Sequence, residues 1–217
     1  MIVKLLIFDL DGTIADTQSS VCEAVNMALS NFGLPTVTPD AVARAMGNGA
    51  LTLIRRLLPE ADRENEAFVR TVFEFYDNAY DKTCISAPFY EGMYEAMIEL
   101  KRRGYLLAVL SNKQDKYVKK MMNSFFEEGL LSHMQGQTPS LPAKPDPTVP
   151  LVIAEKLGIS PSDCAFIGDS DVDVLTAKNA GMTGVACAWG YRSEEVLAEN
   201  SPEFLIHYPR ELLNIFN

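Results

Sequence analysis

Residues 5–13 read LLIFDLDGT, an uninterrupted apolar run that ends in two aspartates, Asp9 and Asp11. A continuous apolar run bounded by polar residues is typical of a strand buried on both faces, as in a parallel sheet flanked by helices. In open α/β sheets, ligands bind beyond the carboxyl ends of the strands. Side chains two residues apart on an extended backbone share a face. The sequence therefore predicts a functional site at the end of this strand, with both carboxylates directed into it.

The two carboxylates of this stretch repel each other unless a cation lies between them. Mg²⁺ is the natural candidate, because this hard cation binds a few carboxylates together with substrate oxygens. Gly12 allows the backbone to turn sharply, and Thr13 offers a hydroxyl beside the loop. We therefore expect Mg²⁺ to be the cofactor of a site built on Asp9 and Asp11.

The composition is that of an ordinary soluble globular protein. The chain has 217 residues, of which 47% are hydrophobic, so it can form one domain or a main domain with a small insertion. Its formal net charge of −10 argues against nonspecific binding to nucleic acids or anionic membranes, which requires a basic patch. No apolar segment approaches the roughly 18 residues that span a bilayer, and the N-terminus lacks a signal-peptide cleavage pattern. We expect a cytoplasmic protein with neither a nucleic-acid nor a membrane partner.

Neither cysteine nor histidine indicates a site. The four cysteines are scattered without a C-x-x-C pair, which favours small buried hydrophobic side chains over a zinc site or a disulfide framework. They are Cys22, Cys84, Cys164 and Cys187. The two histidines, His133 and His207, lie outside every motif described below, so histidine chemistry is not predicted.

The stretch from residue 14 to about residue 84 has a helical pattern. The spacing of its apolar residues predicts helices from residue 19 or 20 to about 31, from Pro39, over 50–58 and over 63–80. This stretch is too long for a single crossover between two strands. We therefore expect an all-helical insert over residues 14–84, placed within an α/β core formed by residues 1–13 and 85–217.

Strands and helices alternate from Pro88 onward. Strands are predicted over residues 106–110, 165–167 and 184–188, and helices over 92–103, 115–126, 148–157, 172–179 and the C-terminal end. The connector that ends near Met134 has no clear pattern. Strands that alternate with helices of about 10 to 15 residues indicate βαβ units. The predicted fold class is α/β, with a Rossmann-like parallel sheet flanked by helices.

Two further candidates follow the strand predicted over residues 106–110. Ser111 and Asn112 end the strand over 106–110 and offer a hydroxyl and an amide to phosphate oxygens, although such a pair is also typical of a helix N-cap. Lys144 lies in a loop stiffened by Pro145, where a fixed cation can neutralise charge on a transferred group. A lysine in a loop is more often simply solvated. Each candidate gains weight from its place at a strand end or in the loop that follows.

An acidic cluster follows the strand over 165–167. Asp169, Asp171 and Asp173 lie within five residues at a strand-to-helix turn. Acidic residues at such a turn also stabilise the helix N-terminus through its dipole. This cluster alone therefore supports two interpretations, a functional site or a helix cap. The order of acid pair, Ser-Asn, lysine and acid cluster, each at a strand end or the following loop, favours a single functional site over independent structural roles.

On these residues the chain resembles the haloacid dehalogenase superfamily, and within it the phosphoglycolate phosphatase-like branch with a helical cap. The four family motifs correspond to residues 9–13, Ser111, Lys144, and Gly168-Asp169 with Asp173. The resemblance covers essentially the whole chain. It implies that the insert over 14–84 is a mobile cap that closes over the site and excludes water.

The resemblance also implies roles for the motif residues. Asp9 corresponds to a nucleophile that forms an aspartyl-phosphate, and Asp11 to a general acid that later acts as a base. Mg²⁺ would be held by Asp9, the backbone carbonyl of Asp11 and Asp169, with Asp173 nearby as an indirect or orienting ligand. The residues implied in phosphate binding are Gly12, Thr13, Ser111, Asn112 and Lys144.

The leaving group is expected to be selected by the insert. Gly47-Asn48-Gly49 resembles the cap loop of phosphoglycolate phosphatases, although a helix C-cap and turn explain it equally well. Residues 189–191, Trp-Gly-Tyr, also resemble that branch. Arg44, Arg55 and Arg56 are available cations for a carboxylate of the substrate, although most such arginines are simply solvated. The resemblance implies a Mg²⁺-dependent phosphomonoesterase acting on a small phosphorylated metabolite, with 2-phosphoglycolate as the first candidate.

Several alternatives remain open from the sequence. A phosphomutase similar to β-phosphoglucomutase shares this core and cap, and a sugar phosphate, a nucleotide or pyrophosphate are other possible substrates. A dehalogenase is disfavoured because that branch does not use the second aspartate, here Asp11. A noncatalytic binding protein is disfavoured by the intact set of Asp9, Asp11, Lys144 and Asp169. The sequence is compatible with a monomer or a homodimer.

Overall fold

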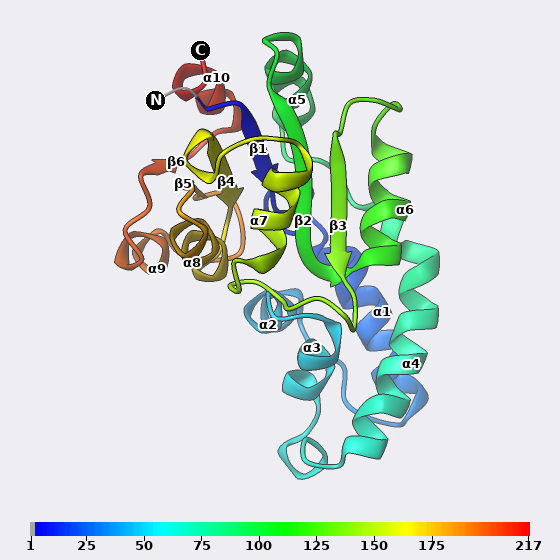
Figure 1. Cartoon of the computed structure of the whole chain (residues 1–217). Coiled ribbons are helices and arrows are strands. Elements are labelled where there is room, and N and C mark those ends of the chain that lie inside the picture. The colour runs from blue at the N-terminus through cyan, green and yellow to red at the C-terminus, as the bar shows by residue number, and fades with distance from the viewer. Residues whose placement is uncertain (1–2) are drawn as a thin grey trace.

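A six-stranded parallel sheet forms the centre of the computed structural model, which describes residues 3–217 (Figure 1). The strand order is β3-β2-β1-β4-β5-β6, and every neighbouring pair is parallel. The strands are β1 (Leu5–Phe8), β2 (Leu106–Gln114), β3 (His133–Gln137), β4 (Cys164–Gly168), β5 (Thr183–Cys187) and β6 (Phe204–Ile206). The predicted α/β class with a Rossmann-like sheet is confirmed.

β1 lies in the middle of the sheet and is fully buried. It pairs with β2 on one side and β4 on the other. Its side chains alternate between the two faces: Leu6 and Phe8 belong to one hydrophobic cluster, and Leu5 and Ile7 to another. The unbroken apolar run is therefore explained by burial on both faces.

Helices cover both faces of the sheet. The Leu5 face packs against α7 (Thr148–Lys156) and α8 (Asp171–Ala180). The Leu6 face packs against α5 (Met93–Arg102), α6 (Asp115–Phe125) and α10 (Leu212–Ile215). α9 (Glu194–Glu199) packs on α8 and β5. Short 3₁₀ turns span Glu60–Asp62, Cys84–Ser86, Pro161–Asp163 and Pro209–Glu211. Because β1 pairs in parallel with β2 and β4, the carboxyl ends of these three strands lie at one edge of the sheet.

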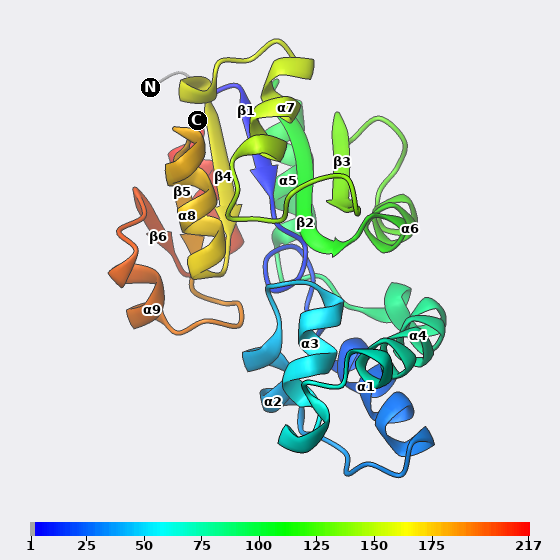
Figure 2. The same cartoon turned by 60° about the horizontal axis from the view of Figure 1, so that its bottom comes forward.

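Four helices gather beside that edge of the sheet (Figure 2). They are α1 (Gln18–Asn31), α2 (Pro39–Ala45), α3 (Ala50–Leu57) and α4 (Glu66–Thr83). Phe32, just after α1, packs edge-on against Phe68 and Phe75 of α4. Pro39 occupies the first turn of α2, as predicted, and the Thr38 hydroxyl accepts a hydrogen bond from the Ala41 amide. The four helices correspond to the four expected in the insert.

Three strand predictions need correction. The connector near Met134 contains β3, and the C-terminal stretch predicted as helical contains β6 between α9 and α10. Both are edge strands, short and incompletely buried, so neither carries the apolar run that marks a central strand. β2 continues to Gln114, beyond its predicted end at residue 110. The apolar pattern stops at Leu110, so the polar end of this strand gives no strand signal in the sequence.

None of the helices in the described range, residues 3–217, has the length and apolar character needed to cross a bilayer.

Candidate functional site

The loop after β1 presents two aspartates at the carboxyl edge of the sheet. Asp9 is buried, and its backbone amide donates to the Ile167 carbonyl of β4 at 2.8 Å. Gly12 then turns the chain with a φ of +85°, a conformation that strains any residue with a Cβ. A Cβ on Gly12 would also lie 2.3 Å from Asp169 Oδ2. Gly12 thus allows the loop to pass directly over the β4 aspartate.

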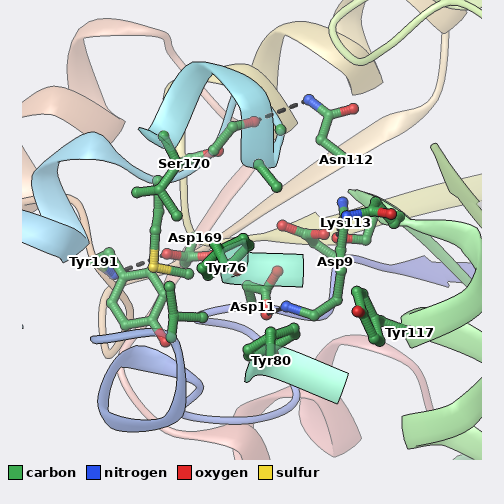
Figure 3. A pocket seen from close by; sticks show the side chains of 18 of the residues that line it. Asp9, Asp11, Tyr76, Tyr80, Asn112, Lys113, Tyr117, Asp169, Ser170 and Tyr191 are labelled. Atoms are coloured by element: carbon green, nitrogen blue, oxygen red, sulfur yellow. Dashed lines mark hydrogen bonds and ion pairs between the residues drawn. The ribbon is translucent and has the colours of Figure 1, made fainter. Parts of the chain in front are cut away.

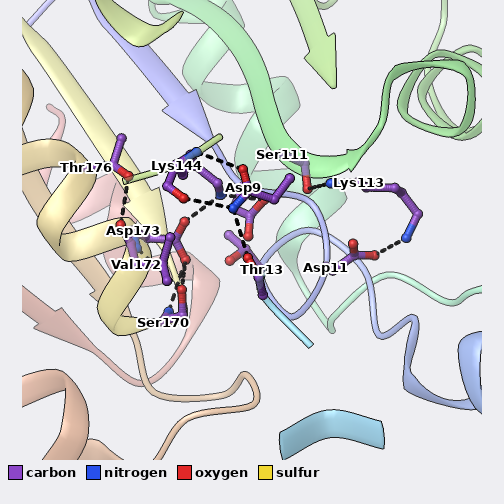
Figure 4. Close-up of polar contacts among 12 residues, drawn as sticks. Asp9, Asp11, Thr13, Ser111, Lys113, Lys144, Ser170, Val172, Asp173 and Thr176 are labelled. Atoms are coloured by element: carbon purple, nitrogen blue, oxygen red, sulfur yellow. Dashed lines mark hydrogen bonds and ion pairs between the residues drawn. The ribbon is translucent and has the colours of Figure 1, made fainter. Parts of the chain in front are cut away.

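Three buried carboxylates meet at this edge. Asp9, Asp169 and Asp173 each place a carboxylate oxygen within 4.8 Å of the other two. Asp169 follows β4, and Asp173 lies in the first turn of α8. Figure 4 shows Asp9 and Asp173 converging from their separate elements. The structure therefore brings together three residues that are up to 164 positions apart in the chain.

Lys144 is the cation of this cluster. Its ammonium lies 2.6 Å from Asp173 Oδ1 and 2.9 Å from Asp9 Oδ1, and its side chain is almost fully buried. The Lys144 backbone is held by the amide of Asn112, which donates to the Lys144 carbonyl at 3.1 Å and accepts from its N–H at 2.8 Å. One lysine opposes three carboxylates, so the cluster carries excess negative charge when ionised.

The burial and close approach of these charged groups shift their pKa values. Desolvation by burial raises the pKa of Asp9, and Asp173 and Asp11 add to the rise while Lys144 opposes it. The pKa of Asp169 is raised by burial and then by the charges of Asp173 and Asp9. Burial alone would lower the pKa of Lys144, but Asp173 and Asp9 raise it above its ordinary value. The site thus favours any change that adds positive charge.

The donor set fits a hard divalent cation. Asp9 Oδ1 is buried without a hydrogen bond and has the Lys144 ammonium 2.9 Å away as an ion-pair partner. An orphaned carboxylate oxygen beside two further carboxylates is suited to Mg²⁺, which prefers oxygen ligands. Asp9 and Asp169 are the residues placed to hold such an ion.

Asp11 is turned toward a different partner. Its Oδ1 accepts from Lys113 Nζ and from Thr17 Oγ1, both at 2.6 Å. Lys113 extends from the end of β2, and its side chain is 7% exposed. Sequence reasoning missed both partners. Lys113 could have been found if the strand had been predicted to continue past residue 110. Residues two apart on a strand share a face, so Lys113 would then have been placed on the same face as Ser111.

Two predicted phosphate ligands are engaged elsewhere. The side-chain amide of Asn112 donates to the carbonyls of Gly47 and Lys144, so both of its hydrogens are engaged. The Thr13 hydroxyl is fully buried and donates to Asp169 Oδ1 at 3.0 Å, so it orients that aspartate. Ser111 is buried beside Asp9 in the same pocket.

The loop over residues 189–191 supports the acidic centre. The Tyr191 amide donates to Asp169 Oδ2 at 2.8 Å, and the Trp189 indole donates to the Thr13 carbonyl at 3.1 Å. The Tyr191 hydroxyl donates to Asp16 Oδ1 at 3.2 Å. Asp169 is therefore fixed at both oxygens. This contribution of residues 189–191 is one that the sequence pattern alone did not reveal.

Both interpretations of the acid cluster hold for α8. Asp173 accepts from the Ser170 backbone and hydroxyl, which completes a capping box at the helix start, and its other oxygen meets Lys144. Asp171 is 40% exposed and lies 3.5 Å from Arg192, away from the three buried carboxylates. The helix cap thus positions Asp173 for the site.

A pocket that is partly open to solvent joins the acidic centre to the helices α1–α4 (Figure 3). Asp9, Asp11 and Ser111 line it on the sheet side. Its opposite walls are mainly apolar and aromatic, formed by Val21, Met46, Leu53, Tyr76 and Tyr80. A ligand bound at the acidic centre would therefore extend into a largely apolar chamber.

The glycine loop between α2 and α3 descends onto the core. The Gly47 carbonyl accepts from Asn112 Nδ2 at 2.9 Å, and a Cβ on Gly49 would lie 2.6 Å from Gln137 Oε1. Gly47 and Gly49 line the pocket, whereas Asn48 is not among the lining residues.

The arginines near this loop do not reach the pocket. Arg55 donates to Glu66 and to the Arg63 carbonyl, and Arg56 donates to the Ala45 carbonyl. Arg44 is exposed on α2. In the described part of the chain, the arginine that lines the pocket is Arg192.

Replacing Gly12 by alanine is expected to destabilise the fold by about 2 kcal/mol and to weaken Mg²⁺ binding, because the new methyl group adds backbone strain and displaces Asp169. The matched control is Gly33→Ala, where φ is +67° and no atom lies within 4 Å of the added Cβ. That variant should lose only about 1 kcal/mol and keep its Mg²⁺ affinity. Urea unfolding and Mg²⁺ titration measure both. Equal Mg²⁺ affinity in the two variants would contradict the close contact.

The fold and the site define an α/β protein with a buried acidic centre at the carboxyl edge of a parallel sheet. The family model of haloacid dehalogenase-like hydrolases matches residues 6–187. The chain therefore belongs to the haloacid dehalogenase-like hydrolase family.

Named relatives match over nearly the full length. A phosphoglycolate phosphatase of Haemophilus influenzae is 34% identical over 219 residues, covering 98% of this chain and 97% of the relative. Phosphoglycolate phosphatase 1 of Pseudomonas aeruginosa is 32% identical, with 97% of this chain and 78% of the relative covered. The crystal structure of a predicted phosphoglycolate phosphatase from Haemophilus somnus superposes with a TM-score of 0.93 at 28% identity, covering 100% of this chain and 99% of the other.

Proposed function

We propose that this protein is a Mg²⁺-dependent phosphomonoesterase that hydrolyses a small phosphorylated metabolite, with 2-phosphoglycolate as the leading candidate. The observation that carries the proposal is the meeting of three buried carboxylates, those of Asp9, Asp169 and Asp173, at the edge of a pocket that Asp9 and Asp169 line. Lys144 pairs with two of them, Asp9 and Asp173. The names of the relatives support the substrate, and membership of the hydrolase family supports the reaction class.

Asp9 is the proposed nucleophile. Its carboxylate oxygen attacks phosphorus, an O–P bond forms, and the bond to the leaving oxygen breaks, which gives an aspartyl-phosphate. Asp9 is suited to this role because it lies at the floor of the pocket and one of its oxygens is free of hydrogen bonds. Hydrolysis of the aspartyl-phosphate releases phosphate and restores the carboxylate.

Asp11 is the proposed proton carrier. It lies two residues beyond the nucleophile and lines the same pocket, where it donates a proton to the leaving oxygen and then accepts one from the attacking water. Thr17 and Lys113 hold its carboxylate in the present geometry.

Lys144 and Ser111 are the proposed ligands of the phosphoryl oxygens. Lys144 supplies fixed positive charge where negative charge accumulates in the transition state, and Asp173 holds the ammonium in place. Mg²⁺, held by Asp9, Asp169 and the Asp11 backbone carbonyl, would reduce the repulsion between an anionic nucleophile and an anionic ester.

Residues 14–84 are proposed to act as a mobile cap. The helices α1–α4 supply the apolar walls of the pocket, while the reacting groups come from the sheet. Ion pairs cross between the two parts, since Asp77 of α4 pairs with Lys116 and Asp81 pairs with Lys120, and they lie beside an edge-on contact between the Tyr80 and Tyr117 rings. Opening of this interface would admit substrate, and closing it would exclude water.

A phosphate-release assay tests the proposed function. The purified protein is incubated with 2-phosphoglycolate, sugar phosphates, nucleotides and pyrophosphate, each with Mg²⁺ or with EDTA. We expect Mg²⁺-dependent release, greatest for 2-phosphoglycolate. Turnover that releases no phosphate and requires a bisphosphorylated sugar would instead identify a phosphomutase.

Mg²⁺ is expected to raise the melting temperature, and more so at pH 8 than at pH 5. The pKa values of Asp9 and Asp169 are raised in the folded, metal-free protein, so the folded state binds more protons than the unfolded state above about pH 4. The free energy of unfolding without metal should therefore fall as the pH rises from about 4 to about 8. Bound Mg²⁺ should oppose this loss of stability. Thermal unfolding with EDTA or Mg²⁺ measures this. In Asp169→Asn the Mg²⁺ effect should largely disappear; an unchanged effect would place the ion elsewhere.

A further inference from the structure

Lys113 lines the pocket with a largely buried side chain, and the proposed chemistry does not require it for phosphate. Its ammonium lies 2.6 Å from Asp11 Oδ1 and 4.8 Å from the centre of the Tyr80 ring. In Figure 4, Lys144 lies on the Asp173 side of Asp9, whereas Lys113 reaches to Asp11 on the other side. The two lysines therefore serve different ends of the site.

The strand places Lys113 beyond the phosphoryl position. Ser111 and Lys113 both belong to β2 and both line the pocket. Two residues of extended strand span about 6.6 Å, so Lys113 begins that distance beyond Ser111. If Ser111 contacts the transferred phosphoryl group and Asp11 the leaving oxygen, the group attached to that oxygen lies next to Lys113.

The Lys113 ammonium has hydrogen-bonding capacity to spare. An ammonium carries three N–H donors, and within residues 3–217 its hydrogen-bond acceptor is Asp11. The other pocket cation, Arg192, is already used, since it donates to the carbonyls of Ala43 and Met46 at 3.2 and 2.8 Å. Lys113 is thus the cation placed to receive an anionic group of a ligand.

The surroundings strengthen such a contact. Lys113 is 7% exposed, and Tyr76 and Tyr80 lie on the adjoining wall of the pocket (Figure 3). Charge-assisted hydrogen bonds gain strength where water is excluded, and a ligand without the anion would leave these donors unpaired in a poorly solvated place. The environment therefore discriminates between charged and neutral leaving groups.

We infer that Lys113 determines substrate specificity by binding a carboxylate carried by the leaving group. The preferred substrates are phosphate monoesters of 2-hydroxy carboxylic acids, in which one carbon separates the ester oxygen from the carboxylate. This inference rests on the proposed function and adds to it the residue that recognises the leaving group.

The test compares two substrates of similar size. One is 2-phosphoglycolate, and the other is 2-hydroxyethyl phosphate, in which a neutral hydroxymethyl group replaces the carboxylate. kcat/KM is measured for both with the wild type, Lys113→Met, and the matched control Lys116→Met, which removes a lysine three residues away that pairs with Asp77. p-Nitrophenyl phosphate reports the chemical step separately.

The preference of the wild type for 2-phosphoglycolate over the neutral ester is expected to fall about ten- to hundredfold in Lys113→Met and to stay unchanged in Lys116→Met. An equal loss on both substrates in Lys113→Met would overturn the inference, because it would show that Lys113 acts only through Asp11. A wild type that hydrolyses p-nitrophenyl phosphate with Mg²⁺ but shows no preference for the charged ester would also overturn it, while leaving the phosphatase proposal intact. Absence of hydrolysis of every ester would instead overturn the proposed function.

A binding measurement separates recognition from turnover. In the Asp9→Asn background, which is designed to bind substrate without hydrolysing it, calorimetry gives the Kd of each ester. Adding Lys113→Met should raise the Kd of 2-phosphoglycolate about tenfold or more and leave that of 2-hydroxyethyl phosphate within about twofold. The same change in both Kd values would contradict carboxylate recognition by Lys113.

Discussion

Asp9→Asn is expected to reduce kcat at least about 10⁴-fold while the protein stays folded, because an amide cannot serve as the nucleophile in place of a carboxylate. The substitution is nearly isosteric and removes the charge of one of the three buried carboxylates that cluster at the site. Burial raises the pKa of Asp9, which means that its charge is costly in the metal-free fold. The variant should therefore melt at a higher temperature than the wild type in EDTA. Steady-state phosphate release and thermal unfolding check the two effects.

The matched control for this variant is Asp171→Asn. It makes the same chemical change close to the acidic centre, at a side chain that is 40% exposed and points toward Arg192 at 3.5 Å. Its kcat should remain within about threefold of the wild type, since exposed pairs contribute little. Retention of Mg²⁺-dependent hydrolysis by Asp9→Asn would show that the nucleophile has been assigned to the wrong residue.

Lys144→Met is expected to lose at least about 10³-fold in kcat/KM and about 3 to 5 kcal/mol in the free energy of unfolding without metal. The ammonium lies within 3 Å of carboxylate oxygens of both Asp9 and Asp173, so its removal leaves buried charges without their counter-ion. The loss of stability should be greater at pH 8 than at pH 5, because the carboxyls left behind can be neutralised by protons at the lower pH. Urea unfolding at the two pH values measures this difference.

Lys119→Met provides the comparison for stability. Lys119 forms a surface ion pair with Asp115 one helical turn away, and its side chain is 53% exposed. Its removal should cost less than about 1 kcal/mol, with little dependence on pH. A Lys144→Met protein as stable as Lys119→Met at pH 8 would show that Lys144 does not balance the charge of the cluster.

Local patterns were sufficient for most of the fold. The apolar run before Asp9 predicted a buried central strand because a strand covered on both faces needs apolar side chains at every position. The amphipathic spacing of the insert predicted four helices close to their observed bounds. The edge strands β3 and β6 were not predicted, because β3 is partly exposed and mostly polar and β6 has only three residues, too few to show a period.

The side-chain partners within the site were less predictable. Asn112 was expected to bind phosphate, but it holds the Lys144 and Gly47 carbonyls, because the loops that carry them pass beside the end of β2. Thr13 orients Asp169, and Lys113 pairs with Asp11. Each of these contacts joins separate segments of the chain, and a pattern read along one segment does not report which other segment faces it.

The order of residues along the chain was thus enough to indicate an acidic centre at the carboxyl edge of a parallel sheet, because strand ends in such a sheet must gather at one edge. Only the folded structure determined that Lys144 lies between Asp9 and Asp173, that Lys113 faces Asp11, and that the arginines of the insert stay away from the pocket. The physical reason is that distances between side chains on different elements depend on how helices and loops pack over the sheet, and packing is a property of the whole chain.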